Sequence, residues 1–92
     1  HVLDAASIAL AAATGRASVS VARKPRVTVL SGGDELVAPG RIPAADQIFD
    51  SMSIGIAALA GQWGAAATAV GPLPDHANKI ADALQKAISQ SD

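Results

Sequence analysis

Two adjacent carboxylates, Asp34 and Glu35, are the residues whose types and position most favour chemistry in this chain. They follow Gly32 and Gly33, which end an apolar run over residues 27–30. Consecutive glycines allow positive φ and close approach of a ligand, so their N–H groups can converge on an anion. Ligands of open α/β sheets collect beyond the carboxyl ends of strands, where an acidic pair can hold a metal ion or act as a base. The pattern predicts a site at this turn.

The elements after this turn alternate between helix and strand. One helical face is formed by Ile56, Leu59, Ala60 and Trp63, and we expect Trp63 in the core. A strand is predicted over residues 65–70, followed by a last helix with Asp75 as its N-cap. Such alternation implies right-handed crossovers and a parallel sheet. The predicted fold class is therefore α/β, a partial three-layer sandwich with a mostly parallel sheet, truncated after the second crossover helix.

A further helix and strand are predicted before this unit. Asp4 is a good N-cap and Gly15 a good terminator for a helix over residues 5–14. Val19 and Val21 alternate with small residues, which is the period of a half-buried strand.

Composition and charge limit the classes of function. The 92 residues correspond to one small domain or a part of one. A formal net charge of −1 gives no electrostatic footprint for nucleic acid. We interpret the basic cluster of Arg23, Lys24 and Arg26 as a solvated edge rather than a phosphate site. The apolar stretch at residues 2–13 is too short to span a bilayer, so we expect a cytoplasmic protein with no membrane or nucleic-acid partner.

The string VARKPRVTVLSGGDELVAPG, residues 21–40, resembles the segment that opens the molybdopterin-binding domain of the molybdopterin molybdenumtransferase family, the MoeA and gephyrin E-domain proteins. The family pattern is an apolar strand, Ser-Thr-Gly-Asp-Glu-Leu, a loop, and Asp-Ser/Thr-Asn opening a helix. Here Asp50-Ser51 stands at the loop-to-helix position, and the turn at residues 71–75 ends the next strand. By this resemblance, residues 1–22 are a lead-in helix and strand, and residues 23–92 are the N-terminal half of the molybdopterin-binding domain.

The resemblance implies a role in molybdenum cofactor biosynthesis, namely insertion of molybdenum from molybdate into adenylylated molybdopterin, with Mg²⁺. It makes Glu35 and Asp75 the catalytic and metal-binding carboxylates, which agrees with the preference of Mg²⁺ for hard oxygen ligands beside a pyrophosphate. The cofactor-binding residues that it implies are Ser31, Gly32, Gly33, Asp34, Asp50 and Ser51. The family pattern also implies a homodimer, with a pterin as the small-molecule substrate and an adenylyltransferase as a partner.

Three positions depart from the family pattern. Gly32 replaces a threonine, Met52 an asparagine and His76 a second aspartate. The family's later glycine-rich and lysine-bearing loops and its separate N-terminal domain are not among these residues, so we expect the 92 residues alone to be inactive. Two alternatives stay open: a CinA-like competence-damage domain, which carries a similar pattern, and a non-catalytic module that keeps the fold for assembly.

Overall fold

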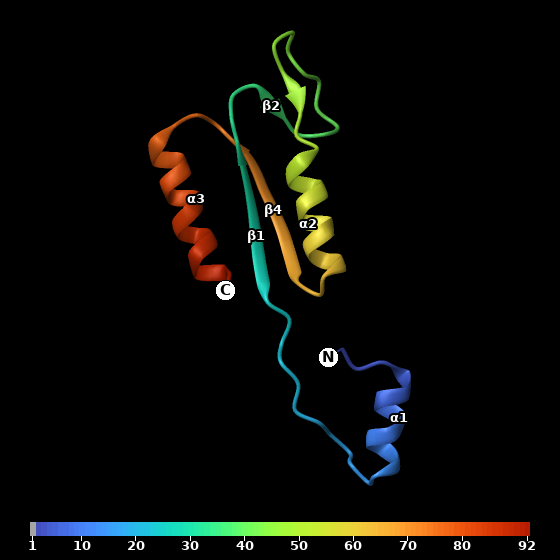
Figure 1. The fold of residues 1–92 in the computed structure, drawn as a ribbon. Coiled ribbons are helices and arrows are strands. Elements are labelled where there is room, and N and C mark those ends of the chain that lie inside the picture. The colour runs from blue at the N-terminus through green and yellow to red at the C-terminus, as the bar shows by residue number, and fades with distance from the viewer. Residues whose placement is uncertain (1) are drawn as a thin grey trace.

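Two parallel strands form the centre of the computed structural model, which describes residues 2–92. They are β1 (Arg26–Gly32) and β4 (Ala66–Leu73). The register is regular up to Leu30 and shifts between Leu30 and Gly32. Because the strands are parallel, their carboxyl ends lie at the same end of the sheet (Figure 1). Both strands run further than the sequence predicts, since pairing continues through Gly32 and Leu73 despite the glycines and proline near their ends.

Helices lie on both sides of this strand pair. Helix α2 (Met52–Gln62) connects β1 to β4 and packs against both strands, and α3 (Ala77–Gln90) packs against β1. Figure 1 shows the two strands between the two helices. The half-buried positions of α3 include Ile80, Ala83 and Ala87, which share one helical face. The predicted α/β class with a parallel sheet is confirmed.

A second pair of parallel strands, each two residues long, lies close to the end of β1. It consists of β2 (Leu36–Val37) and β3 (Ile48–Phe49), which flank a long loop over residues 38–47 that contains Pro39, Gly40 and Pro43. The N–H of Ile48 donates to the carbonyl of Glu35 at 2.7 Å, and that of Asp50 donates to Val37 at 2.9 Å. This pairing places the start of α2 next to the turn that follows β1.

The lead-in helix α1 (Ala5–Ala13) lies apart from the sheet at the end of an extended segment (Figure 1). Its predicted N-cap is confirmed, since Asp4 Oδ1 accepts the N–H of Ser7 at 2.8 Å. The predicted strand at Val19 and Val21 is wrong, because residues 18–25 form neither helix nor strand. The alternating pattern alone is not enough to form a strand. Both valines are exposed, and no strand among residues 2–92 pairs with this segment.

Apolar side chains are incompletely covered throughout the part of the chain that the structure describes. No hydrophobic residue of 2–92 is buried, and the radius of gyration is 19.0 Å, where a compact domain of this length would have about 12 Å. The predicted core position of Trp63 is wrong, since its side chain is 80% exposed. Of the predicted helical face only Ala60 is half-buried. Ile56 and Leu59 are exposed as well, because the sheet covers a neighbouring face of α2 that carries Ser53 and Ala57. None of the helices described is long and apolar enough to cross a membrane.

Candidate functional site

Two acidic turns meet at the carboxyl ends of β1 and β4. The N–H of Asp34 donates to Asp75 Oδ2 at 3.2 Å, and the N–H of Asp75 donates to Asp34 Oδ1 at 3.1 Å. The predicted placement of these residues at neighbouring strand ends is therefore confirmed. The predicted N-cap role of Asp75 is wrong, because the N-cap of α3 is His76. The Asp75 carboxylate instead turns across to β1, where it binds the otherwise unpaired N–H of Asp34.

Glu35 lies close to Asp34 in the chain but is placed differently. Its carboxylate lies over Gly33, since a Cβ built on that glycine would be 2.5 Å from Glu35 Oε2. Among residues 2–92 the Glu35 carboxylate makes no hydrogen bond or ion pair, so both of its oxygens are available to a ligand. The buried Gly33 has φ of +133°, and its N–H donates to the carbonyl of Leu73 at 3.0 Å. That N–H group is therefore occupied and does not face an anion, contrary to the sequence-based expectation for the glycine pair.

A buried carboxylate, Asp50, lies beside these turns. It is 5% exposed, and its Oδ2 accepts the hydroxyls of Ser31 and Ser53 while its Oδ1 accepts the N–H of Ser53. The hydrogen bond from Ser31, followed by that from Ser53, holds the pKa of the Asp50 carboxyl below its ordinary value. Asp50 thus caps α2, whereas Ser51, in the formal N-cap position, makes no side-chain cap bond.

Sequence reasoning missed Ser53, although a signal was present. An Asp-x-x-Ser spacing before a helix is typical of a side-chain cap, and the same spacing recurs at Asp4 and Ser7. Ser53 is 6% exposed, and its hydroxyl is the second one, after that of Ser31, that donates to the Asp50 carboxylate.

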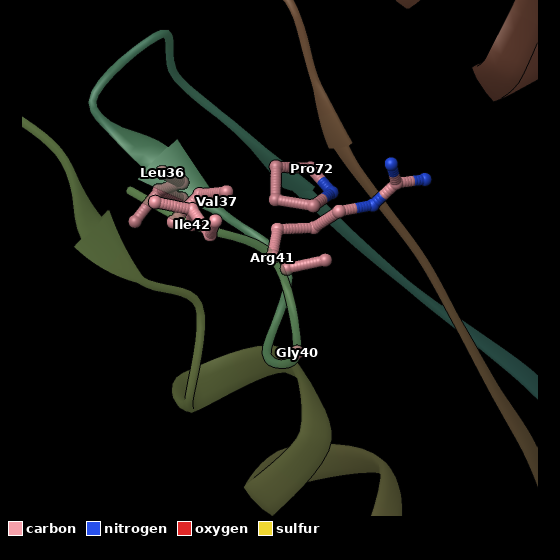
Figure 2. Close-up of a pocket in the computed structure, with 7 residues that line it drawn as sticks. Leu36, Val37, Gly40, Arg41, Ile42 and Pro72 are labelled. Atoms are coloured by element: carbon pink, nitrogen blue, oxygen red, sulfur yellow. The ribbon is translucent and has the colours of Figure 1, made fainter. Parts of the chain in front are cut away.

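An open groove of about 640 Å³ lies next to the acidic turns. Its apolar part comes from β2 and the loop after it, and Figure 2 shows the Arg41 side chain extended beside Pro72. Among the described residues, the Arg41 guanidinium makes no hydrogen bond or ion pair. The lining includes Leu36, Val37, Gly40, Arg41, Ile42 and Pro72. Sequence reasoning missed Arg41, the one basic residue of the long loop.

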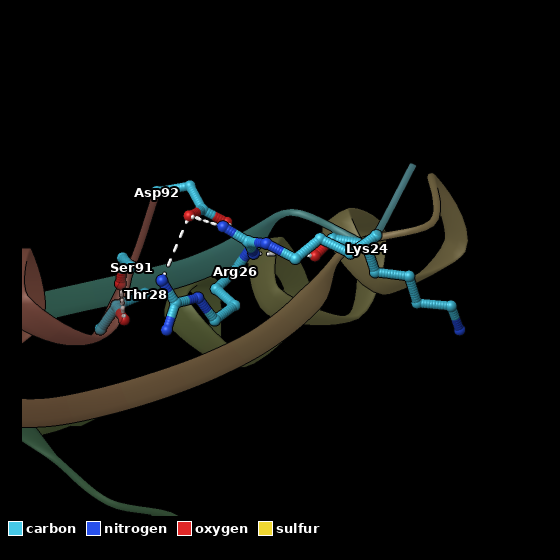
Figure 3. A network of polar contacts seen from close by, with 6 residues as sticks. Lys24, Arg26, Thr28, Ser91 and Asp92 are labelled. Carbon is cyan, nitrogen blue, oxygen red and sulfur yellow. Dashed lines mark hydrogen bonds and ion pairs between the residues drawn. The ribbon is translucent and has the colours of Figure 1, made fainter. Parts of the chain in front are cut away.

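The basic cluster lies far from this groove, at the amino end of β1 (Figure 3). Arg23 and Arg26 both form ion pairs with Asp92, and the N–H of Arg26 donates to Asp92 Oδ2 at 2.8 Å. The Arg23 guanidinium, together with the Arg26 N–H, lowers the pKa of Asp92. Two of the three basic side chains are therefore paired with Asp92, and the cluster is exposed, as the interpretation as a solvated edge requires. The three cations are not all available to bind a phosphate.

The acidic turns do not form a complete metal cage. Among residues 2–92, no group of three or more His, Cys, Asp or Glu side chains lies close enough together to hold a metal ion. The chain itself brings together two carboxylates, Asp34 and Asp75, with Glu35 next to them in sequence. Such a set can hold a cation only if the substrate or water completes its coordination.

Known proteins similar to this chain include molybdopterin molybdenumtransferases. No family model matches it. A molybdopterin molybdenumtransferase of Nostoc sp. is 39% identical over 90 residues, which cover 98% of this chain and 21% of the relative. Molybdopterin molybdenumtransferase 2 of Mycobacterium tuberculosis is 35% identical over 86 residues, covering 94% of this chain and 21% of the relative.

Solved structures agree with the sequence relatives. A molybdopterin biosynthesis MoeA protein from Pyrococcus horikoshii has a TM-score of 0.86 at 29% identity, over 97% of this chain and 23% of that chain. The chain fits a fragment of MoeA. A second MoeA structure has a TM-score of 0.78 at 27% identity, covering 98% of this chain and 24% of that chain. The MoeA-like chain thus spans about a fifth of the length of its curated relatives.

Proposed function

We propose that the protein carrying this chain acts in molybdenum cofactor biosynthesis and inserts molybdenum from molybdate into adenylylated molybdopterin. The observation that carries this proposal is the meeting of two acidic turns at adjacent parallel strand ends, in a segment whose sequence and fold match MoeA. The names of the sequence relatives support the reaction class. The resemblance adds a homodimer, an adenylyltransferase partner and a cytoplasmic location as proposals.

The acidic turns fit a magnesium ion of the kind that substrate phosphates help to bind. Mg²⁺ commonly takes one or two carboxylates and completes its octahedron with phosphates and water. We keep Glu35 and Asp75 as the proposed catalytic and metal-binding residues. Asp34 joins them because its carboxylate meets the Asp75 turn. A bound Mg²⁺ would neutralise charge on the pyrophosphate of the adenylylated pterin.

The groove beside these turns suits the rest of such a substrate. Its apolar side chains can cover a flat ring system, and most small-molecule sites combine apolar walls with a few polar groups. Arg41 supplies the cation, and a guanidinium binds phosphate oxygens through paired N–H donors. We therefore assign to Arg41 those phosphate oxygens of the substrate that a bound Mg²⁺ would leave free.

The experiment compares carboxylate variants of the complete gene product. Glu35→Gln and Asp75→Asn should each lower the rate of molybdenum insertion, measured with adenylylated molybdopterin, molybdate and Mg²⁺, by about 10²-fold or more. Asp82→Asn, on the exposed surface of α3, is the matched control and should leave the rate unchanged. Full activity in both site variants would overturn the catalytic proposal and favour the non-catalytic assembly module.

A further inference from the structure

Asp50 lies beside the acidic turns, and its hydrogen bonds connect the end of β1 to the start of α2. We propose that Asp50 is a positioning residue of this site: acting through Ser31, it sets the approach of β1 to β4 and so the separation of Asp34 from Asp75. The catalytic consequence rests on the proposed function, whereas the geometric consequence does not.

The first step is that Asp50 fixes Ser31. The carboxylate is nearly fully buried, and none of the ion pairs among residues 2–92 involves it. A buried carboxylate without a cation is tolerated only when hydrogen-bond donors surround it. Those donors are Ser53, at the start of α2, and the Ser31 hydroxyl at the end of β1. Asp50 therefore ties the last part of β1 to the first turn of α2.

The second step is that Ser31 touches β4. A Cβ built on Gly71 would be 2.5 Å from Ser31 Oγ and 2.7 Å from the Ser31 carbonyl oxygen. The Ser31 hydroxyl that Asp50 holds thus faces a backbone position with no room for a side chain. The contact lies where the register of the two strands shifts, which is the point at which their approach is not set by a regular ladder.

The third step leads from that contact to the carboxylates. Beyond it, the N–H of Gly33 donates to Leu73, and the turns then exchange the two hydrogen bonds between Asp34 and Asp75. A change in the position of Ser31 shifts the strand ends that carry both turns. Asp50 itself offers nothing to a ligand, because its oxygens are occupied by serine donors. In this proposal Asp50 therefore acts on the site indirectly, through Ser31.

The test uses Asp50→Asn in the complete gene product, with Asp4→Asn as the matched control. Asp4 has the same helix-capping contacts in α1, accepting the N–H and the hydroxyl of Ser7 at 2.8 and 2.7 Å, but it is exposed and has no counterpart of the Ser31 hydrogen bond. Asp50→Asn should speed hydrogen exchange at the amides of residues 34 and 75 by about tenfold relative to the mid-strand amide of Val29. It should lower kcat by about 10- to 100-fold with KM little changed, as for residues that orient a ligand from behind. Asp4→Asn should change none of these.

A second variant keeps the test decisive where Asp50→Asn does not fold. Ser31→Ala leaves Asp50 capped by Ser53 and should change the same two amides in the same direction. Unchanged exchange at residues 34 and 75 in the folded variants would overturn the inference. So would a fall in kcat without any change at those amides, since Asp50 would then contact the substrate itself. A wild-type protein without transferase activity would defeat the proposed function, and the exchange measurement would still decide the geometry.

Discussion

The carboxylates of Asp34 and Asp75 each accept the backbone N–H of the other, at 3.1 and 3.2 Å, across 41 positions of the chain. This exchange joins the two turns without any cation. Each carboxylate uses one oxygen for the partner turn, so the second oxygen can bind a ligand. The same two side chains can therefore hold the turns together and bind a ligand.

Removing one member should release the N–H of the other. In Asp34→Ala, the amide of residue 75 loses its acceptor, and in Asp75→Ala the amide of residue 34 does. A net loss of about 1 kcal/mol for each of these exposed hydrogen bonds corresponds to about fivefold faster exchange at the released amide. Native-state hydrogen exchange measures this directly. An Asp75 amide that exchanges equally fast in Asp34→Ala and in wild type would contradict the reciprocal arrangement.

Gly71→Ala should destabilise the protein more than Gly40→Ala. Both glycines have positive φ, at +129° and +90°, so both substitutions strain the backbone by about 1–3 kcal/mol. Only at Gly71 would the new Cβ also meet Ser31, whereas Gly40 has nothing within 4 Å. The additional cost should be about 1–3 kcal/mol, typical of overpacking. Chemical denaturation of the two variants measures the difference.

The contact itself can be tested by a second substitution. Adding Ser31→Gly to Gly71→Ala removes the hydroxyl that the new Cβ would meet, and it should recover part of the loss. Equal destabilisation by Gly71→Ala and Gly40→Ala would show that Ser31 does not press against β4.

Acid should remove the stabilising contribution of Asp50. Its pKa is lowered in the folded protein by the Ser31 and Ser53 donors. The contribution is therefore complete above the unfolded carboxyl pKa of about 3.9, and it is lost as the pH falls through the lower folded value. The difference in melting temperature between wild type and Asp50→Asn should be constant from pH 7 to about pH 5 and should shrink below about pH 4. Parallel curves down to pH 3 would be the contrary result.

Arg41→Ala should weaken binding of an anionic pterin. Losing a charge-assisted hydrogen bond costs about 1.5–3 kcal/mol, which is about 10- to 100-fold in affinity. Binding by the wild type should also weaken with added salt, because this cation is exposed. Calorimetry with the pterin measures the affinity, and Arg16→Ala, next to α1, is the control. Similar affinities in the two variants would exclude Arg41 from the site.

Local signals in the sequence predicted local structure well. The N-cap at Asp4 is a contact over three residues, so the sequence alone contains both partners. The alternation of helices and strands predicts the crossover from β1 through α2 to β4 because chain connectivity restricts the topology. The position of the acidic residues at neighbouring strand ends follows from the same restriction.

Contacts between distant segments were not predictable in the same way. Aspartate is a residue type that commonly caps helices, so the sequence predicts that role for Asp75. Only the three-dimensional structure shows that the Asp75 carboxylate instead accepts the N–H of Asp34, on the turn after β1. Trp63 fits the apolar period of α2, but the sheet covers a neighbouring face of that helix, at Ser53 and Ala57, and leaves Trp63 exposed. Val19 lies in a segment whose residues alternate as in a strand. A strand forms only where a neighbouring strand supplies hydrogen-bond partners, and none of the described strands pairs with this segment.

The β1/β4 pair has a further consequence for handling the isolated 92 residues. Among the residues that the structure describes, no strand pairs with the outer side of β4, whose sequence is AATAVGPL. Such a row of unpaired backbone groups can template other chains and nucleate aggregation. At the start of β1, Asp92 occupies the opposite margin at Arg26, since its N–H donates to the Arg26 carbonyl and its carboxylate accepts the Arg26 N–H. β4 carries no charged side chain to do the same, so self-association should begin there.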